Sequence, residues 1–186
     1  MKFIKFLFII FITLPTTIKA DLNENLISEL KDGGKLVFIR HAYAPGSGDP
    51  DDFNINDCNK QRNLNYAGIE QAKDIGNFFK NNQIEIDKIL SSEWCRCKET
   101  AFLAFKNYET KKFLNSFFSP KFAHNKETQI MDLKKYVNKW KSDKNLVFVT
   151  HYVVISEVLD YASLSGEIVI SDRKFENIGS IKVKYK

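Results

Sequence analysis

Several features are absent from or scarce in this chain of 186 residues. No apolar run approaches the roughly 20 residues that span a bilayer, because the run from Phe6 to Leu14 covers only nine. The sequence contains no tandem repeat and no low-complexity linker, and this continuity favours one domain. Cysteine and histidine occur three times each, and a Cys-x-Cys pair with one distant cysteine lacks the usual spacing of zinc ligands.

The first twenty residues have the pattern of a cleaved signal peptide. Lys2 and Lys5 make a basic start, the apolar run follows, and Ala20 supplies the small residue before a cleavage site. An uncleaved membrane anchor is the alternative, which the short run disfavours. We therefore expect residues 1–20 to be removed and residues 21–186 to form one periplasmic or secreted domain without stable membrane insertion.

The net charge carries little information about partners once this leader is set aside. The formal charge falls from +5 to +2 when Lys2, Lys5 and Lys19 are removed with the leader. A balance this close to neutrality gives no reason to expect binding to nucleic acid.

Strand-like and helix-like segments alternate along the remaining chain. Strands are expected at Lys35–Ile39, Lys88–Leu90, Lys112–Leu114, Asn145–Val149, Ile168–Ile170 and Ile181–Tyr185. Helices are expected at Asp21–Gly34, from a cap at Asn63 or Asn65 to Asn81, and at Trp94–Phe105, Thr128–Lys141 and Tyr152–Tyr161. Residues 42–63 form a loop of a length that is typical of functional loops. This alternation predicts an α/β three-layer sandwich, with helices on both faces of a mostly parallel sheet.

Two apolar strands end in nearly the same way. Residues 36–41 read LVFIRH and residues 146–151 read LVFVTH, so each strand leads directly into a histidine. Ligands of open parallel sheets bind beyond the carboxyl ends of the strands. If the strands are neighbours, His41 and His151 converge on one site beside Arg40. Either histidine alone would also fit an ordinary residue at the edge of the sheet.

A second arginine follows another strand end. The expected strand ending at Leu90 leads into a helix whose first turn holds Arg96. A helix N-terminus with an added guanidinium is suited to binding an oxyanion. The alternative for Arg96 is a surface salt bridge to Glu93 or Glu99.

These motifs together resemble the histidine phosphatase superfamily. The matching segments are Arg40-His41, where the family usually continues with glycine and this chain has Ala42, then Arg62-Asn63-Leu64-x-x-x-Gly68-x-x-Gln71-Ala72, Ser91-Ser92-x-x-x-Arg96-x-x-x-Thr100-Ala101, and Thr150-His151. The small size and the lack of a cap domain are similar to the compact phosphohistidine-phosphatase-like members. The leader and the Gly-Asp-Pro loop look more like exported members, some of which act on envelope sugar phosphates.

The resemblance implies a metal-independent phosphoric monoester hydrolase that needs no cofactor. His41 would attack phosphorus to form a phosphohistidine that water then hydrolyses, with His151 as the second catalytic histidine. Arg40 and Arg96 would hold the phosphoryl oxygens and would lower the pKa of His41, which must be neutral to attack. The partner would be a small phosphorylated molecule, with an envelope sugar phosphate as one candidate.

The proton donor for the leaving group is not at the family's common positions, which here hold Asn115-Ser116 and Tyr152. The candidates are Glu93, close to Arg96, and Asp49, Asp51, Asp52 or Asp57 in the long loop, with Glu93 and Asp57 as the first choices. Two further functions remain open, a non-catalytic phosphate-ligand binding protein of the same fold and a phosphoryl mutase on a sugar or glycerate phosphate.

The three cysteines are expected to form one disulfide and to leave one thiol, as is usual in exported proteins. Position 97 corresponds to a small packed residue in the resembling family, which favours Cys58 with Cys95 as the pair. Such a bond would hold the long loop over the site.

Overall fold

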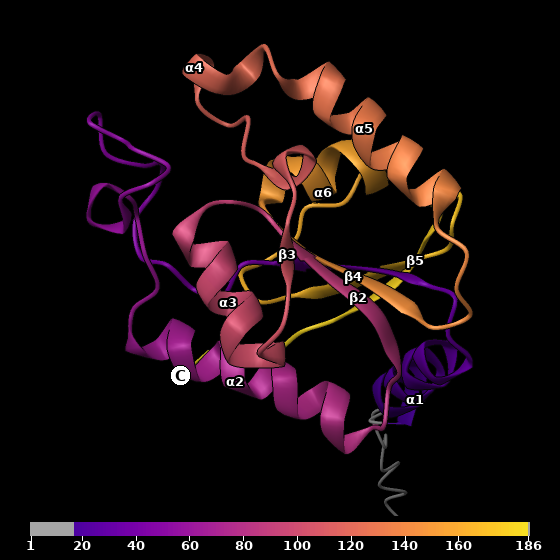
Figure 1. The fold of residues 1–186 in the computed structure, drawn as a ribbon. Helices are drawn as coiled ribbons and strands as arrows, with labels where there is room; N and C mark the ends of the chain where they lie inside the picture. Colours follow the sequence, from indigo (N-terminus) through magenta and orange to yellow (C-terminus); the bar gives the residue numbers. More distant parts are fainter. Residues whose placement is uncertain (1–16, 186) are drawn as a thin grey trace, which may run out of the picture.

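The computed structural model describes residues 17–185 and is built around one six-stranded sheet (Figure 1). The strands are β1 (Leu36–Arg40), β2 (Ile86–Ser91), β3 (Glu109–Thr110), β4 (Asn145–Thr150), β5 (Ile168–Ser171) and β6 (Asn177–Ile181), in the spatial order β3-β2-β4-β1-β5-β6. The four strands from β3 to β1 are parallel, whereas β5 and β6 run antiparallel to their neighbours.

Helices cover both faces of this sheet. The helices are α1 (Thr17–Asp32), α2 (Tyr66–Asn81), α3 (Cys95–Phe105), α4 (Pro120–Ala123), α5 (Lys126–Lys139) and α6 (Tyr152–Leu159), with two short 3₁₀ turns, η1 (Cys58–Lys60) and η2 (Lys112–Leu114). In Figure 1, α1, α2 and α3 lie below the sheet, and α5 and α6 lie above it. The predicted α/β sandwich with a mostly parallel sheet is therefore confirmed.

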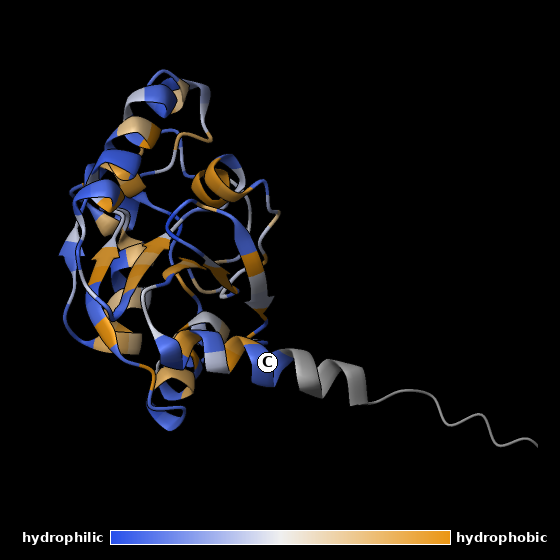
Figure 2. Ribbon diagram, turned by 90° about the vertical axis from the view of Figure 1, so that its right-hand side faces the viewer, coloured by the Kyte–Doolittle hydropathy of each residue, from blue (hydrophilic) through white to orange (hydrophobic). Residues whose placement is uncertain are grey.

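Hydrophobic patterning explains why the central strands occupy the middle of the sheet. All six residues of β4 and the first four of β1 are buried, as expected for strands covered on both faces. In Figure 2 long stretches of the sheet are coloured as hydrophobic, while several helices alternate between hydrophobic and hydrophilic turns. Of the two predicted caps of helix α2, the structure uses Asn65, whose side chain accepts a hydrogen bond from Gly68 N.

Two of the predicted strands are placed differently by the structure. Lys112–Leu114 is the turn η2, because the edge strand β3 pairs with the end of β2 only through Glu109 and Thr110 and the chain then turns inward to bury Leu114. The last strand is Asn177–Ile181 rather than Ile181–Tyr185. Its register with β5 sets Ile181 opposite Ile168, so that Ile181 enters the core as the last residue of the hairpin.

The predicted signal peptide falls almost wholly outside the described residues and stays a prediction, as does the domain boundary after residue 20. Within residues 17–185, no helix is long and apolar enough to cross a membrane.

Candidate active site

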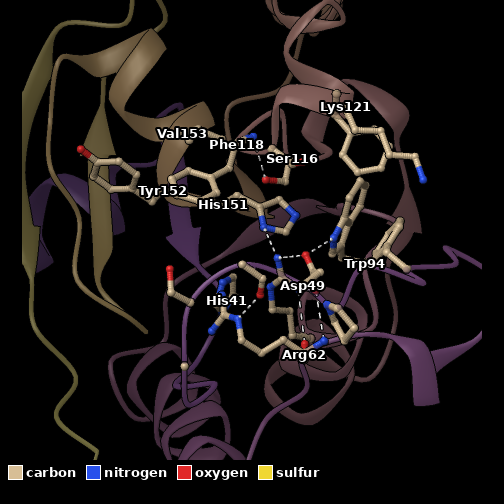
Figure 3. A pocket seen from close by; sticks show the side chains of 18 of the residues that line it. His41, Asp49, Arg62, Trp94, Ser116, Phe118, Lys121, His151, Tyr152 and Val153 are labelled. Carbon is tan, nitrogen blue, oxygen red and sulfur yellow. Dashed lines mark hydrogen bonds and ion pairs between the residues drawn. The ribbon is translucent and has the colours of Figure 1, made fainter.

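The parallel pairing of β1 with β4 brings the two predicted histidines together. Arg40 lies opposite Thr150 in the register, and His41 N donates a hydrogen bond of 2.9 Å to Thr150 O. His41 and His151 directly follow this residue pair, His41 after the end of β1 and His151 after the end of β4. Their ring centroids are 5.6 Å apart, with the planes inclined at 68°. Both imidazoles line one cavity at this end of the sheet, as Figure 3 shows.

This cavity, which we call the strand-end pocket, also contains both predicted arginines. It has a volume of about 310 Å³ and is lined by segments that follow β1, β2 and β4, by the loop of residues 46–62 and by the chain around α4. Arg40 is the last residue of β1, and its Nη1 donates to Ser163 O at 2.8 Å. Arg96 lies in the first turn of α3 with only 4% of its side chain exposed. The four residues singled out from the sequence thus surround a single pocket.

Asp49 is the ion-pair partner of Arg96, rather than Glu93 or Glu99. Arg96 Nη1 donates to Asp49 Oδ1 at 2.6 Å, and Nη2 donates to Oδ2 at 3.2 Å. Burial alone would raise the pKa of Asp49, but its hydrogen bonds and its attraction to Arg96 outweigh this effect and lower that pKa. Asp49 is therefore ionised and is unsuited to donate a proton.

His41 is held in the form that a nucleophile requires. Its Nδ1 lies 2.8 Å from Ala42 O, and because a carbonyl can only accept, Nδ1 carries the ring proton. The other ring nitrogen, Nε2, has no hydrogen-bond partner among the described residues and keeps its lone pair. Burial and then the charge of Arg96 hold the pKa of His41 well below its usual value, so the ring is neutral.

His151 is also neutral and is held by neighbours on α3 and the preceding loop. Its Nε2 lies 2.9 Å from Ser92 Oγ, and its Nδ1 lies 3.5 Å from Nη2 of Arg96. Since a guanidinium cannot accept a hydrogen bond, Nδ1 is the acceptor and Nε2 carries the proton. Burial, followed by the charge of Arg96, lowers the pKa of His151 well below its usual value.

Arg62 is a third guanidinium in the pocket that the sequence reasoning did not place there. Its Nε donates to Gly48 O at 2.8 Å and its Nη1 donates to Ala44 O, which secures the start of the long loop. Burial and the charge of Arg96 lower the pKa of Arg62. The sequence signal was present, because Arg62 opens the Arg-Asn-Leu segment that resembles the superfamily, but the resemblance gave this arginine no role in the site.

The long loop is tied to α3 immediately beside Arg96. Cys58 is bonded to Cys95, and the side chain of Gln61 accepts a hydrogen bond of 2.9 Å from Cys95 N. Cys97 is the free thiol, and it is fully buried, which raises its pKa to about 12. The loop that contributes Asp49 and Arg62 is therefore fixed to the helix that contributes Arg96.

Two of the predicted proton donors, Glu93 and Asp57, do not line the pocket. Glu93 accepts a hydrogen bond of 2.7 Å from Asn115 Nδ2 and lines a neighbouring cavity instead. Asp57 caps the turn η1, where its carboxylate accepts from Asn59 N at 3.0 Å. Their positions do not support a role as proton donor. Two other carboxylates line the strand-end pocket, the ion-paired Asp49 and the exposed Asp51.

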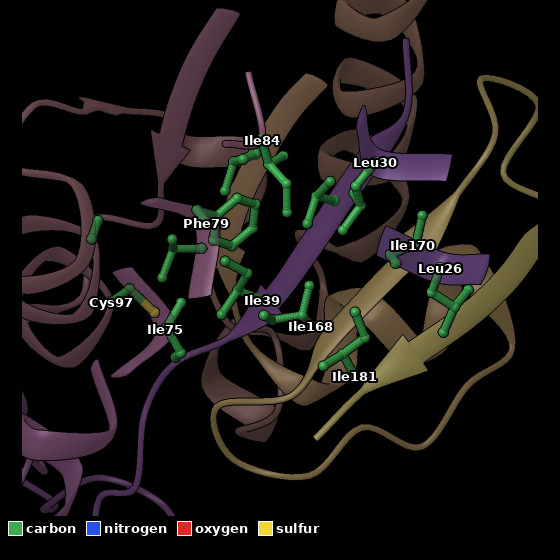
Figure 4. Close-up of a cluster of buried hydrophobic side chains, with 14 of the residues drawn as sticks. Leu26, Leu30, Ile39, Ile75, Phe79, Ile84, Cys97, Ile168, Ile170 and Ile181 are labelled. Carbon is green, nitrogen blue, oxygen red and sulfur yellow. The ribbon is translucent and has the colours of Figure 1, made fainter. Parts of the chain in front are cut away.

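A hydrophobic cluster supports the pocket from one side of the sheet (Figure 4). Ile39 precedes the Arg40-His41 pair, and Cys97 follows Arg96, and both belong to this cluster with Ile75 of α2. All three side chains are completely buried. Because close-packed interiors resist displacement, the backbone that carries His41 and Arg96 is firmly held.

No family model matches this sequence. An 85-residue segment is 29% identical to the broad-specificity phosphatase YOR283W of Saccharomyces cerevisiae, and this segment covers 46% of the chain and 35% of the yeast protein. The chain thus matches about a third of the length of that relative.

Solved structures are similar over most of the chain. TTHB049 from Thermus thermophilus superimposes with a TM-score of 0.55 at 15% identity, covering 79% of this chain and 98% of that one. The protein histidine phosphatase SixA, solved with tungstate, gives a TM-score of 0.51 at 14% identity, covering 78% and 93%. The resemblance to the histidine phosphatase superfamily that the motifs indicated is thereby confirmed at the level of the fold.

We predict that replacing Cys58 by serine destabilises the protein. The bond joins residues 37 positions apart, and closing a loop of that length stabilises a fold by roughly 3–4 kcal/mol. Urea unfolding of the Cys58→Ser variant and of the wild type, each with and without dithiothreitol, measures the loss. The reductant should lower the stability of the wild type to that of the variant and leave the variant unchanged. Equal midpoints for the oxidised and reduced wild type would contradict the prediction.

Proposed function

We propose that this protein is a phosphatase that hydrolyses a phosphate monoester through a phosphohistidine on His41. The observation that carries the proposal is the state of that ring. His41 is neutral, its Nδ1 proton is bonded to Ala42 O, and its Nε2 lone pair is free in a pocket that contains three guanidinium groups. A neutral nucleophile among fixed cations suits attack on a phosphate dianion.

Unsatisfied donors in the pocket lining support an oxyanion as the ligand. Nε of Arg40 and Nε of Arg96 are buried and have no hydrogen-bond partner within residues 17–185. Buried N–H groups without a partner are rare and costly, and each such group in a native site calls for an explanation. Because both atoms are enclosed by the protein, a phosphoryl group held by Arg40 and Arg96 would satisfy these donors after a small shift of the side chains, since its oxygens only accept.

The reaction then proceeds in two displacements. Nε2 of His41 forms a bond to phosphorus while the bond from phosphorus to the leaving oxygen breaks and that oxygen takes a proton from a general acid. Water then forms a bond to phosphorus while the bond to Nε2 breaks, its proton passes to the carboxylate that the general acid has become, and inorganic phosphate leaves. The dianion beside His151 raises the pKa of that ring and favours its protonation, so that His151 becomes a donor to the phosphoryl group. Every step uses side chains alone, and the proposed chemistry is metal-independent.

The leaving oxygen needs a proton, and we assign its donor to Asp51. This carboxyl lines the strand-end pocket and is exposed, whereas Asp49 is committed to Arg96. Asp51 is therefore the pocket carboxyl that can act as the general acid.

The substrate we propose is a small phosphorylated molecule that meets the enzyme outside the cytoplasm. The Cys58–Cys95 bond supports an oxidising compartment, the periplasm or the exterior, which agrees with the predicted signal peptide. An envelope sugar phosphate is one candidate that such a compartment would supply.

The decisive substitution is His41→Ala, with His124→Ala as the matched control because His124 is exposed outside the pocket. Loss of the nucleophile should lower the rate of aryl phosphate hydrolysis by at least about a thousandfold, while the control keeps the wild-type rate. The assay is run in EDTA. Activity that survives in His41→Ala, or that requires an added metal, refutes the mechanism. A wild type that binds phosphate without turnover would identify a binding protein.

The lowered pKa of His41 predicts the pH profile. The ring stays neutral as the pH falls below 6.5, so kcat/KM should persist at mildly acidic pH and decline only when the lowered pKa is reached. The free energy of unfolding decreases as the pH falls below about 6.5, because the unfolded chain then binds protons that the two native imidazoles do not. Rates and urea midpoints between pH 4 and 8 test both expectations. If kcat/KM falls to half its plateau value at pH 6.5 or above as the solution is acidified, the expectation for His41 is contradicted.

Substitution of Asp51 tests the proton donor. Asp51→Asn should slow hydrolysis of an alkyl phosphate by about 100-fold and change hydrolysis of p-nitrophenyl phosphate little, because nitrophenolate leaves without a proton. Asp52→Asn, on the same loop but in an exposed pair with Lys60, is the control. Equal losses on both substrates would remove Asp51 from this role.

A further inference from the structure

Asp49 accepts hydrogen bonds from three residues in and around the first turn of α3. Besides the two hydrogen bonds from Arg96, its Oδ2 accepts from Trp94 Nε1 at 3.1 Å and its Oδ1 accepts from Arg62 N at 3.1 Å. These donors come from the segment before α3, from α3 itself and from the far end of the long loop. The carboxylate is 17% exposed, so it forms part of the pocket wall rather than the open surface.

The contacts of Arg96 are unevenly divided between the two edges of its guanidinium. Such a group can grip an oxyanion along the edge of Nη1 and Nη2 or along the edge of Nε and Nη2. Asp49 fills the first edge, and the remaining hydrogen of Nη1 is directed to Arg62 O at 3.3 Å. On the second edge, Nε has no partner in the described part of the chain, and Nη2 has only the long contact to His151.

The loop is shaped to bring Asp49 to this position. Gly46 and Gly48 have φ angles of +85° and +72°, a region that side chains disfavour, and they turn the chain directly before Asp49. Arg62 holds the same turn through Gly48 O, and the Cys58–Cys95 bond fixes the loop to α3. The position of this carboxylate is therefore determined by several independent constraints.

We propose that Asp49 is a positioning residue, which holds Arg96 by one edge so that the edge of Nε and Nη2, next to His151, receives a phosphoryl oxygen. The inference rests on the proposed function of the pocket and adds a role for a loop that the catalytic residues leave unexplained. Four donors from three residues bind this carboxylate, so an incoming phosphate would have to break four hydrogen bonds to displace it. Nε and the second hydrogen of Nη2 take no part in these four bonds, so an oxyanion can occupy this edge, once Nε is uncovered, without breaking any of them.

A rival role for Asp49 predicts the opposite effect. If its carboxylate only occupies the phosphate site as a competing anion, its neutralisation frees Arg96, and inorganic phosphate binds more tightly. If Asp49 positions Arg96, its neutralisation lets the guanidinium turn away, and phosphate binds more weakly. The sign of the change in phosphate affinity therefore distinguishes the two roles.

The experiment compares Asp49→Asn with Asp52→Asn, which neutralises a neighbouring acid that does not contact Arg96. Isothermal titration with inorganic phosphate and steady-state kinetics with an aryl phosphate are measured for both. We expect Asp49→Asn to bind phosphate about tenfold more weakly and to lose about 100-fold in kcat/KM, with kcat and KM both affected, because small misplacements at a reacting centre are costly. Asp52→Asn should match the wild type.

Each outcome of this experiment either supports or overturns the role of Asp49. Unchanged or tighter phosphate binding by folded Asp49→Asn overturns the inference. Should that variant fail to fold, Asp49→Glu decides, because it keeps the charge but displaces the carboxylate, and phosphate binding equal to the wild type would overturn the inference. A wild type that neither binds nor hydrolyses phosphate compounds removes the proposed function and the inference with it. A wild type that does both, beside an Asp49→Asn variant that matches it, removes only the inference.

Discussion

The parallel pairing of β1 with β4 is the constraint on which the rest of the site depends. Five residue pairs hold the two strands in register, and the next hydrogen bond, from His41 N to Thr150 O, carries that register into the pocket. The separation of His41 and His151 therefore follows from the sheet itself rather than from a flexible loop. A slip of one residue would turn every side chain of a strand to the opposite face, so the buried residues on both strands enforce the geometry.

The electrostatic balance of the pocket complements this rigid frame. Arg40, Arg62 and Arg96 supply positive charge, burial together with these arginines keeps both imidazoles neutral, and Asp49 offsets part of the charge. A buried guanidinium with no counter-charge would be costly, and a pocket with too many carboxylates would repel a phosphate. The Asp49–Arg96 pair meets both requirements, because it stabilises the arginine and still leaves one guanidinium edge unsatisfied. The need to hold Asp49 beside Arg96 accounts for the long loop over the pocket and for the Cys58–Cys95 bond that fixes this loop to α3.

The sequence was sufficient to predict the features that come from regular structure. Continuous apolar runs ending in His41 and His151 predicted central strands, and the structure brings these residues together with Arg40 and Arg96. The failures lie where long-range contacts override local pattern. Lys112–Leu114 has strand-like composition but turns inward after a two-residue edge strand. Glu93 is adjacent to the site in sequence, yet Asn115 draws its side chain toward another cavity. No local signal distinguished Asp49 from the other acids of its loop.

The most direct test of the central claim, attack by Nε2 of His41, is to trap the covalent intermediate. The wild-type protein is mixed with a ³²P-labelled phosphate ester in EDTA, quenched in alkali within milliseconds to seconds, digested and mapped by mass spectrometry. The account predicts a phosphoryl group that survives alkali, is lost in acid, and resides on the peptide that contains His41. Turnover with the label on another residue, or with no label on the protein at any quench time, would contradict it.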